Sequence, residues 1–351
     1  MEVVFRVDAS VELGAGHVMR CLTLAEALRD ARSKVLFLTR EIPGNALELI
    51  RSRGFAAHFL ADEEPRSIPQ ILAVLGFGNP VDWLVVDHYR LDRRWEAGAH
   101  AACRYLAVID DLADRAHECD VLLDQNYYVD ADSRYRALVP PRCRMFLGPR
   151  FALLRKEFYV AAARLRSRSG AVERILVSFG ATDPTNETSK VLSALRRIEH
   201  GAQIDVVLGA TNPRTAQVEQ ECASLPGCRS FVQTAKMAEL MSMADLAVGA
   251  GGVTTWERCL LGLPAITVAV AENQVRTTTD LAAAGATWYM GEATELSERS
   301  YELAVAQALR SPERLRSMAT ISRRIMGPVP AAGTYIHPLA QQMLEASATQ
   351  Q

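Results

Sequence analysis

The chain has 351 residues, of which 49% are hydrophobic and 23% charged, and its formal net charge is −2. This composition is that of a globular protein long enough for two or three domains. The near balance of charge excludes the broad basic surface that a nucleic acid or an acidic membrane requires. No apolar run approaches the roughly 20 residues that span a bilayer, and residues 1–10 lack the features of a signal peptide, so we expect a cytoplasmic protein.

The seven cysteines are scattered and odd in number. They form no Cys-x-x-Cys pair, and no histidine lies near them at the spacing of a zinc site. We therefore expect reduced, mostly buried thiols and no metal site.

The first fifteen to twenty residues contain a pattern that indicates an anion-binding turn with a histidine beside it. Residues 3–7 are a short apolar run that predicts a strand, and the spacing of apolar residues after Val18 predicts a helix. Between them, Gly14 and Gly16 permit a turn whose backbone N–H groups point at an anion. His17 lies at this turn, where the positive end of the helix disfavours imidazolium, so it is a candidate general base. A structural histidine in an ordinary strand, turn and helix is the alternative.

Strands and helices alternate through the first half of the chain. Apolar patterns predict strands at 34–39, 83–86, 105–109 and 121–123, and helices at 45–53 and 93–102. Such alternation predicts a mostly parallel sheet with helices on both faces. Polar clusters follow four of the strands, at Asp8 and at 87–89, 110–111 and 124–126. Because ligands bind at the carboxyl ends of parallel strands, we expect a site there, with helix capping as the alternative.

A charged, serine-bearing stretch at 164–170 separates the halves and is interpreted as a solvated linker. After it, 174–178 repeats the opening of strand and glycine, and Asp183 to Thr185 predicts a helix start. Further strands are expected at 204–208, 231–232, 246–248 and 265–268, and helices at 237–244, 275–284, 292–309, 312–325 and 337–346.

The strongest signal in the second half runs from Gly249 to Glu257. A glycine-rich loop leads from a strand into a helix, so backbone N–H groups and the hydroxyls of Thr254 and Thr255 can ligate a pyrophosphate. Glu257 can accept hydrogen bonds from both hydroxyls of a ribose. The alternative is that a threonine caps the helix and Glu257 only complements its dipole.

Taken together, these motifs resemble the UDP-sugar hydrolases of pseudaminic acid biosynthesis. The resemblance runs from about residue 3 to about residue 290, and its stretches are Arg6-x-Asp8-x-Ser10, Gly14-x-Gly16-His17-x-Met19-Arg20-Cys21, 87–89, 110–111, 124–126, 148–155, 251–257 and 272–274. It implies an α/β fold with two Rossmann-like domains in a GT-B arrangement and the ligand cleft between them. The first domain, at 1–163, would bind the sugar and carry the base, the second, at 174–335, would bind UDP, and 336–351 would pack on the first.

The family implies hydrolysis of UDP-2,4-diacetamido-2,4,6-trideoxy-β-L-altropyranose to UDP and the free L-altrose sugar, with inversion and with no metal or cofactor. His17 matches the catalytic base. The positions that match or are candidates for substrate contacts are Asp8, Gly14, Gly16, Met19, Arg20, Tyr89, Asn126, Arg150, Gly251, Gly252, Thr254, Thr255, Glu257, Asn273 and Gln274. The loop at 231–234 is expected near the uracil, and His88 is a second candidate for a catalytic or sugar-binding histidine.

Three other functions stay open at this point. The first is a GT-B glycosyltransferase that hands the sugar of a UDP-sugar donor to an acceptor. The second is a hydrolase of an epimeric UDP-diacetamido sugar, and the third is a sensor that binds a nucleotide sugar without catalysis. In each case the expected partner is a nucleotide sugar, with no nucleic acid and no stable membrane insertion.

Overall fold

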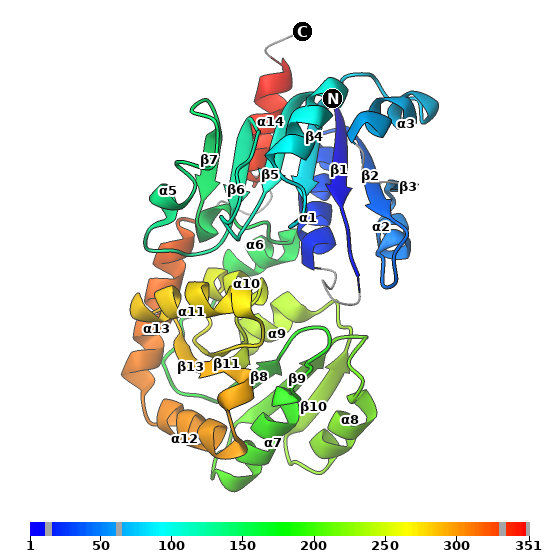
Figure 1. Cartoon of the computed structure of the whole chain (residues 1–351). Helices are drawn as coiled ribbons and strands as arrows, with labels where there is room; N and C mark the ends of the chain where they lie inside the picture. Colours follow the sequence, from blue (N-terminus) through cyan, green and yellow to red (C-terminus); the bar gives the residue numbers. More distant parts are fainter. Residues whose placement is uncertain (11–15, 61–64, 330–334, 349–351) are drawn as a thin grey trace. The chain divides into compact units, whose positions relative to one another are not determined.

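The chain folds into two compact α/β units, shown in Figure 1. The structure, a computed structural model, describes residues 1–10, 16–60, 65–329 and 335–348. Unit 1 comprises Met1–Asn126, Asp130–Leu154 and Ile336–Gln351, and unit 2 comprises Tyr127–Val129 and Arg155–Tyr335. Residues 155–163, which we expected in the first domain, thus group with unit 2. The domain limits expected from the sequence stay a prediction.

Unit 1 is built on a seven-stranded sheet of order β3-β2-β1-β4-β5-β6-β7, in which every neighbouring pair is parallel. Its strands are β1 (Glu2–Val7), β2 (Lys34–Arg40), β3 (Ala56–Leu60), β4 (Val81–Asp87), β5 (Cys103–Ile109), β6 (Val121–Asp124) and β7 (Arg144–Leu147). Its helices are α1 (Gly16–Asp30), α2 (Leu47–Ser52), η1 (Pro65–Ser67), α3 (Ile68–Val74), α4 (Arg93–Ala99), η2 (His100–Ala102), α5 (Ala131–Arg134), η3 (Pro149–Phe151) and α14 (Pro338–Ala348).

Apolar side chains cover both faces of this sheet, which is why its central strands are continuous apolar runs. On one face α1 and α14 pack over the sheet, and Phe5 stacks on Phe37 with 4.9 Å between ring centroids. On the other face α3 and α4 pack over β4 and β5. The indole N–H of Trp83 donates to the carbonyl of Met343 at 3.2 Å, so α14 is tied directly to β4.

Unit 2 is built on a six-stranded sheet of order β10-β9-β8-β11-β12-β13, again parallel throughout. Its strands are β8 (Arg174–Ser178), β9 (Gln203–Leu208), β10 (Cys228–Val232), β11 (Leu246–Ala250), β12 (Ala265–Ala269) and β13 (Trp288–Glu292). Its helices are α6 (Lys156–Ala162), α7 (Glu187–Arg197), α8 (Thr215–Ala223), α9 (Met237–Met243), α10 (Thr254–Leu260), η4 (Glu272–Gln274), α11 (Val275–Ala283), η5 (Ala293–Glu295), α12 (Glu298–Leu309) and α13 (Pro312–Met326). The predicted pair of parallel α/β sheets is confirmed.

The strands that the sequence did not predict are β3, β7 and β13, and all three are edge strands. An edge strand is covered less completely than a central one, so its sequence carries a weaker apolar pattern. The helix expected from residue 292 is wrong in its first turns, because β13 ends there and Ser297 caps a helix that begins at Glu298. The helix expected to start near Asp183 begins at Glu187, whose N–H donates to the Asp183 carboxylate at 2.8 Å.

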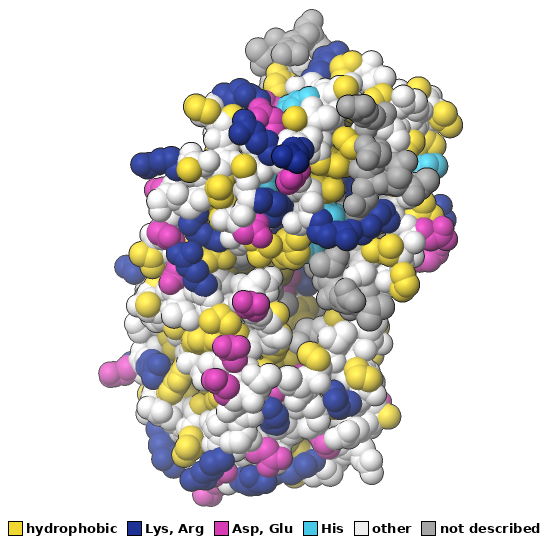
Figure 2. Space-filling view, viewed as in Figure 1, with side chains coloured by type: hydrophobic (Ala, Val, Ile, Leu, Met, Phe, Trp, Pro, Cys, Tyr) yellow, Lys and Arg dark blue, Asp and Glu magenta, His cyan; other side chains and the backbone are white. Residues whose placement is uncertain are grey.

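On the face of the molecule in Figure 2, Lys and Arg side chains are interspersed with Asp and Glu, in keeping with the small net charge. None of the helices among the described residues has the length and hydropathy that crossing a membrane requires. The seven cysteines are free thiols, and five of them are buried, as the prediction of mostly buried thiols requires.

A buried histidine makes the stability of unit 1 depend on pH. His117 Nδ1 lies 2.7 Å from Glu96 Oε1, and His117 Nε2 lies 3.8 Å from Asp110 Oδ2. Burial alone would lower the pKa of His117, but the nearby Asp110 carboxylate and the hydrogen-bonded Glu96 carboxylate outweigh burial and raise the pKa to about 9. The folded protein therefore holds a proton that the unfolded chain releases near pH 6.5, about the ordinary value for histidine.

We predict that raising the pH from about 6 to about 9.5 removes roughly 3 kcal/mol of unfolding free energy from the wild-type protein relative to His117→Gln. The contribution of His117 is fully present below its unfolded pKa and is lost as the pH rises through its folded pKa. Urea unfolding at a series of pH values measures the difference. His58→Gln, a change at a half-buried histidine on β3, is the control and should leave the slope unchanged. Equal slopes in wild type and His117→Gln would contradict the prediction.

Candidate functional site

Unit 1 gathers polar side chains at the carboxyl ends of β1, β4 and β5, which are neighbours in the sheet. The first turns of α1 contribute His17 and Arg20 to the same place. The cluster at this edge consists of His17, Arg20, Asp87, Tyr89 and Asp111. Parallel strands ending side by side are where α/β folds bind ligands, so the cluster is the candidate site of unit 1.

The central contact is between His17 and Asp87. His17 Nδ1 lies 2.6 Å from Asp87 Oδ1, and the imidazole meets the ring of Tyr89 edge to face with 4.5 Å between centroids. A carboxylate at Nδ1 favours the tautomer in which Nδ1 donates and Nε2 holds the lone pair. The Asp87 side chain is fully buried, whereas that of His17 keeps 10% of its surface exposed. His17 is thus oriented through one nitrogen and offers the other as a general base.

Arg20 holds the Asp87 carboxylate from the other side. Its Nε donates to Oδ2 at 2.6 Å and its Nη2 to Oδ1 at 2.7 Å, while Nη1 reaches Asp111 Oδ2 at 3.0 Å. Burial by itself would raise the pKa of Asp87, but the charge of Arg20 and the hydrogen bonds from Arg20 and His17 outweigh burial and hold the pKa well below its usual range. Asp87 is therefore ionised at neutral pH. Arg20 Nη2 also lies 3.0 Å from His17 Nδ1. The expected contact of Arg20 with substrate stays a prediction, since its guanidinium is engaged with Asp87, Asp111 and His17.

Sequence analysis placed Asp87 at a strand end but gave it no role. The signal that was available is the order of the sheet, since β1 and β4 must be neighbours for α1, which follows β1, to reach the end of β4. That order is a tertiary fact, and it brings together two residues that are 70 positions apart in the chain.

Asp8 lies beside this cluster and is fully engaged by protein donors. Its carboxylate accepts from Arg6 Nη1 at 2.6 Å and from Arg40 Nε at 2.8 Å, and His88 Nε2 lies 3.1 Å away. His88 Nδ1 accepts the N–H of Arg90 at 3.1 Å, so the proton of the neutral ring sits on Nε2. His88 therefore lacks the unengaged nitrogen that a base needs, and Asp8 holds the strand ends together. A sugar contact by Asp8 stays a prediction.

The remaining expected contacts of unit 1 lie at several places. Gly14 falls outside the described residues. Gly16 is the exposed first residue of α1, and Met19 is half-buried on the next turn. Asn126 is half-buried after β6, where its N–H donates to Asp124 Oδ1 at 2.9 Å. Arg150 is exposed on η3 after the edge strand β7, with its guanidinium 4.5 Å from the ring centroid of Phe151.

In unit 2 the candidate site is the loop between β11 and α10. A Cβ on Gly251 would lie 2.4 Å from Thr278 Oγ1, so only glycine fits at this point without a shift. A Cβ on Gly252 would lie 3.6 Å from Gln274 Nε2. Gln274 Oε1 accepts the N–H of Val270 at 3.1 Å. The structure thus brings Gly251, Gly252 and Gln274 together, and Asn273 is exposed next to Gln274 on η4.

Glu257 is buried on α10 with one oxygen paired and one unpaired. Its Oε1 accepts from Arg155 Nη2 at 3.0 Å, whereas Oε2 has no hydrogen-bond partner in the described part of the chain. Burial raises the pKa of Glu257, and the charge of Arg155 opposes that rise. A buried acceptor without a donor indicates a place where a ligand hydroxyl binds. Arg155, the last residue of the stretch 148–155, had no expected role from the sequence, and it also pairs with Glu157 at 3.1 Å.

The alternative that a threonine caps α10 is wrong. The residue before the helix is Val253, and no side chain caps the N-terminus. Thr255 is buried, and its hydroxyl accepts from Arg258 Nη2 at 2.9 Å. Thr254 is half-buried. Of the two hydroxyls, that of Thr255 is therefore already engaged with protein.

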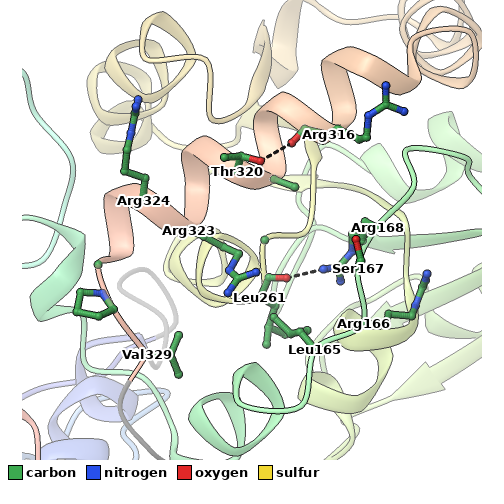
Figure 3. Close-up of a pocket in the computed structure, with 14 residues that line it drawn as sticks. Leu165, Arg166, Ser167, Arg168, Leu261, Arg316, Thr320, Arg323, Arg324 and Val329 are labelled. Atoms are coloured by element: carbon green, nitrogen blue, oxygen red, sulfur yellow. Dashed lines mark hydrogen bonds between the residues drawn. The ribbon is translucent and has the colours of Figure 1, made fainter.

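A separate basic groove of about 680 Å³ lies on unit 2, and Figure 3 shows the residues that line it. Arg168 binds the carbonyls of Met241, Ala244 and Leu261, which holds the stretch 164–170 against the body of the unit. The interpretation of this stretch as a solvated linker is therefore wrong for Arg168. The groove shares no residue with the glycine loop.

Comparison with solved structures decides the fold. MurG of Acinetobacter baumannii matches with a TM-score of 0.67 at 14% sequence identity, over 97% of this chain and 99% of that chain. The fold is GT-B. Within this GT-B chain, residues 175–326 match the family model of the glycosyltransferase family 28 C-terminal domain. The predicted fold is confirmed.

Sequence comparison adds two relatives of the GT-B chain. The UDP-2,4-diacetamido-2,4,6-trideoxy-β-L-altropyranose hydrolase of Campylobacter jejuni is 26% identical over 287 residues, which is 81% of this chain and 97% of that protein. The uncharacterized protein MJ1062 of Methanocaldococcus jannaschii is 28% identical over 277 residues, 76% of this chain. The match covers 55% of MJ1062, so it spans about half the length of that relative.

The fit of Gly251 against Thr278 gives a prediction about the glycine loop. We expect Gly251→Ala to lower the free energy of unfolding by about 1 to 3 kcal/mol, because the added methyl overlaps Thr278 Oγ1. Thr278 Oγ1 has no hydrogen-bond partner among the described residues, so adding Thr278→Ala should restore most of the loss. Urea unfolding measures all three variants.

Gly252→Ala is the matched control, since its methyl would make only ordinary contacts. We expect its effect to stay within about 0.5 kcal/mol. If Gly251→Ala and Gly252→Ala lowered the free energy of unfolding equally, the fit against Thr278 would not be the reason for glycine at 251. The reason would then be the backbone conformation of the loop.

Proposed function

We propose that this protein hydrolyses UDP-2,4-diacetamido-2,4,6-trideoxy-β-L-altropyranose to UDP and 2,4-diacetamido-2,4,6-trideoxy-L-altrose, a step of nonulosonic acid biosynthesis. The observation that carries the proposal is the 2.6 Å contact between His17 Nδ1 and Asp87 Oδ1, which orients an imidazole base. Two comparisons support it: the similarity to the Campylobacter jejuni hydrolase along 97% of its length, and the family 28 match over the unit that holds the glycine loop.

In the proposed reaction, His17 Nε2 removes a proton from a water molecule. The water oxygen forms a bond to the anomeric carbon while the bond from that carbon to the β-phosphate oxygen breaks, and UDP leaves with the electron pair. Attack opposite the leaving group inverts the configuration. Asp87 stabilises the imidazolium that forms, and Arg20 keeps Asp87 ionised throughout.

Unit 2 supplies the nucleotide contacts in this proposal. Glu257 Oε2, the buried oxygen without a partner, accepts from a ribose hydroxyl. The backbone N–H groups of Gly251 and Gly252 and the hydroxyl of Thr254 bind the diphosphate. Because UDP leaves readily once its charge is stabilised, a single base suffices and no second carboxylate is needed as a general acid. Asn273, Gln274, Tyr89, Asn126 and Arg150 stay predicted substrate contacts.

A glycosyltransferase is the second candidate, and the family 28 match and the likeness to MurG favour it. A transferase would use the same base and the same nucleotide site, but an acceptor hydroxyl would attack the anomeric carbon in place of water. The two functions differ in one measurable requirement, since a hydrolase releases UDP from its substrate in buffer alone and a transferase depends on an acceptor.

We predict that wild-type protein releases UDP from the diacetamido sugar nucleotide in the presence of a chelator and without an acceptor. In His17→Asn and Asp87→Asn, release should fall at least about a hundredfold, because the first removes the base and the second lets the imidazole take the wrong tautomer. The affinity of both variants for UDP should be unchanged. A coupled assay for UDP and calorimetric titration with UDP measure the two quantities.

His100→Asn is the control, because His100 lies half-buried at the other end of unit 1 before β5. Its turnover should match that of wild type. Turnover that persists in His17→Asn would contradict the proposed base. Release that depends on an added acceptor would favour the transferase, and UDP binding without any release would favour an epimeric substrate or a sensor.

A further inference from the structure

Arg258 is a buried cation next to the glycine loop, and no carboxylate contacts it among the described residues. Only 3% of the residue is exposed. Its Nη2 donates to the carbonyl of Ala250 at 2.8 Å and to Thr255 Oγ1 at 2.9 Å. Its Nε is buried and has no hydrogen-bond partner within the described ranges. The hydrogen bonds of the guanidinium thus go to two neutral acceptors, and the Glu257 carboxyl, which precedes it in the chain, acts on its charge without a hydrogen bond or ion pair.

Such a position needs a physical reason. Burial lowers the pKa of Arg258 to about 10, so the group is still protonated at neutral pH. A charge removed from water is unfavourable unless an anion or a full set of hydrogen bonds compensates it. An apolar side chain would fill the same space without that cost. A buried guanidinium without an ion pair and with an unpartnered Nε among the described residues indicates that an anion binds near it in the working protein.

The guanidinium lies against the strand end that leads into the glycine loop. A Cβ on Gly249 would lie 2.9 Å from Arg258 Nη1 and 2.2 Å from the carbonyl oxygen of Ser178. Glycine at 249 therefore lets the guanidinium approach the backbone of β11. The carbonyl that accepts from Arg258 belongs to Ala250, which directly precedes Gly251. The charge thus sits beside the residues that hold the diphosphate in the proposed function.

Arg168 in the same unit provides a contrast. Burial also lowers its pKa to about 10. Arg168, however, donates to the carbonyls of Met241, Ala244 and Leu261, which lie at the ends of α9 and α10 and carry partial negative charge. Figure 3 shows Arg168 beside Leu261. Its charge is compensated within the protein. By contrast, the acceptors of Arg258 are one carbonyl, that of Ala250, and one hydroxyl, that of Thr255.

We propose that Arg258 is a positioning residue that creates a positive potential at the Gly251–Gly252 loop and makes the site selective for a nucleoside diphosphate over the uncharged nucleoside. This inference rests on the proposed function, because it assumes that the loop binds UDP. Arg258 acts through its field and through its hold on Ala250 and Thr255, without touching the ligand. The field of one charge a few ångströms away in a buried site changes anion affinity by at least about tenfold.

The test measures binding of UDP and of uridine by calorimetry, in wild type, Arg258→Lys, Arg258→Gln and Arg258→Met. The quantity of interest is the ratio of the two affinities, because general damage to the site weakens both ligands together. Arg258→Lys retains the charge and should keep most of the preference for UDP. Arg258→Gln and Arg258→Met both remove the positive charge, one with a polar and one with an apolar side chain. Each should lower the ratio of UDP affinity to uridine affinity at least about tenfold. Either uncharged variant suffices if the other does not fold.

Arg168→Gln is the control, since it removes a half-buried arginine of the same unit that lies away from the loop. It should leave the ratio unchanged. A ratio that is unchanged in Arg258→Gln or Arg258→Met, or equally reduced in Arg258→Lys, would overturn the inference while leaving UDP binding intact. Failure of the wild-type protein to bind UDP would overturn the proposed function, and this inference with it.

Discussion

The Asp87 carboxylate is the point on which the candidate site of unit 1 depends. It ends β4 and is bound from α1 by His17 on one side and by Arg20 on the other. The charge of Arg20 and the hydrogen bonds from Arg20 and His17 outweigh the effect of burial and keep the carboxylate ionised. An ionised carboxylate fixes the tautomer and the direction of the imidazole, so the geometry of the base follows from the ion pair with Arg20. The same contacts join α1 to the centre of the sheet, and the fold and the site therefore share one set of interactions.

In unit 2 the organisation is different, because the candidate site consists of glycines without side chains and of buried polar atoms without hydrogen-bond partners in the described part of the chain. Gly251 and Gly252 have no side chains, and Gly251 fits against Thr278 only for that reason. One oxygen of Glu257 and the Nε of Arg258 are both buried without partners among the described residues. An acceptor and a donor that are buried without hydrogen-bond partners, on adjacent residues of α10, are each unfavourable in the free protein. A ligand that carries hydroxyls and negative charge would relieve both.

The central strands of both sheets were predictable because they are buried on two faces and their sequences are continuous apolar runs. The edge strands β3, β7 and β13 were missed because partial exposure weakens that pattern. For the site, the sequence indicated His17, Glu257 and the glycines, which stand in recognisable local motifs. It did not indicate Asp87 as the partner of His17 or Arg155 as the partner of Glu257, because these pairs are 70 and 102 positions apart. Such pairs depend on strand order and packing, which a single sequence does not state.

The helix α14 has a consequence for how the chain is assembled. Leu339, Ala340 and Met343 belong to the same apolar core as α1, and Trp83 of β4 is hydrogen-bonded to the carbonyl of Met343. The core of unit 1 is thus completed by residues that follow all of unit 2 in the chain. During synthesis on a ribosome, the sheet of unit 1 emerges first. The part of its face that α14 covers stays exposed until some 180 further residues, those of unit 2, have been made. The order of synthesis and the order of completion are therefore opposite: the second unit can finish folding before the first.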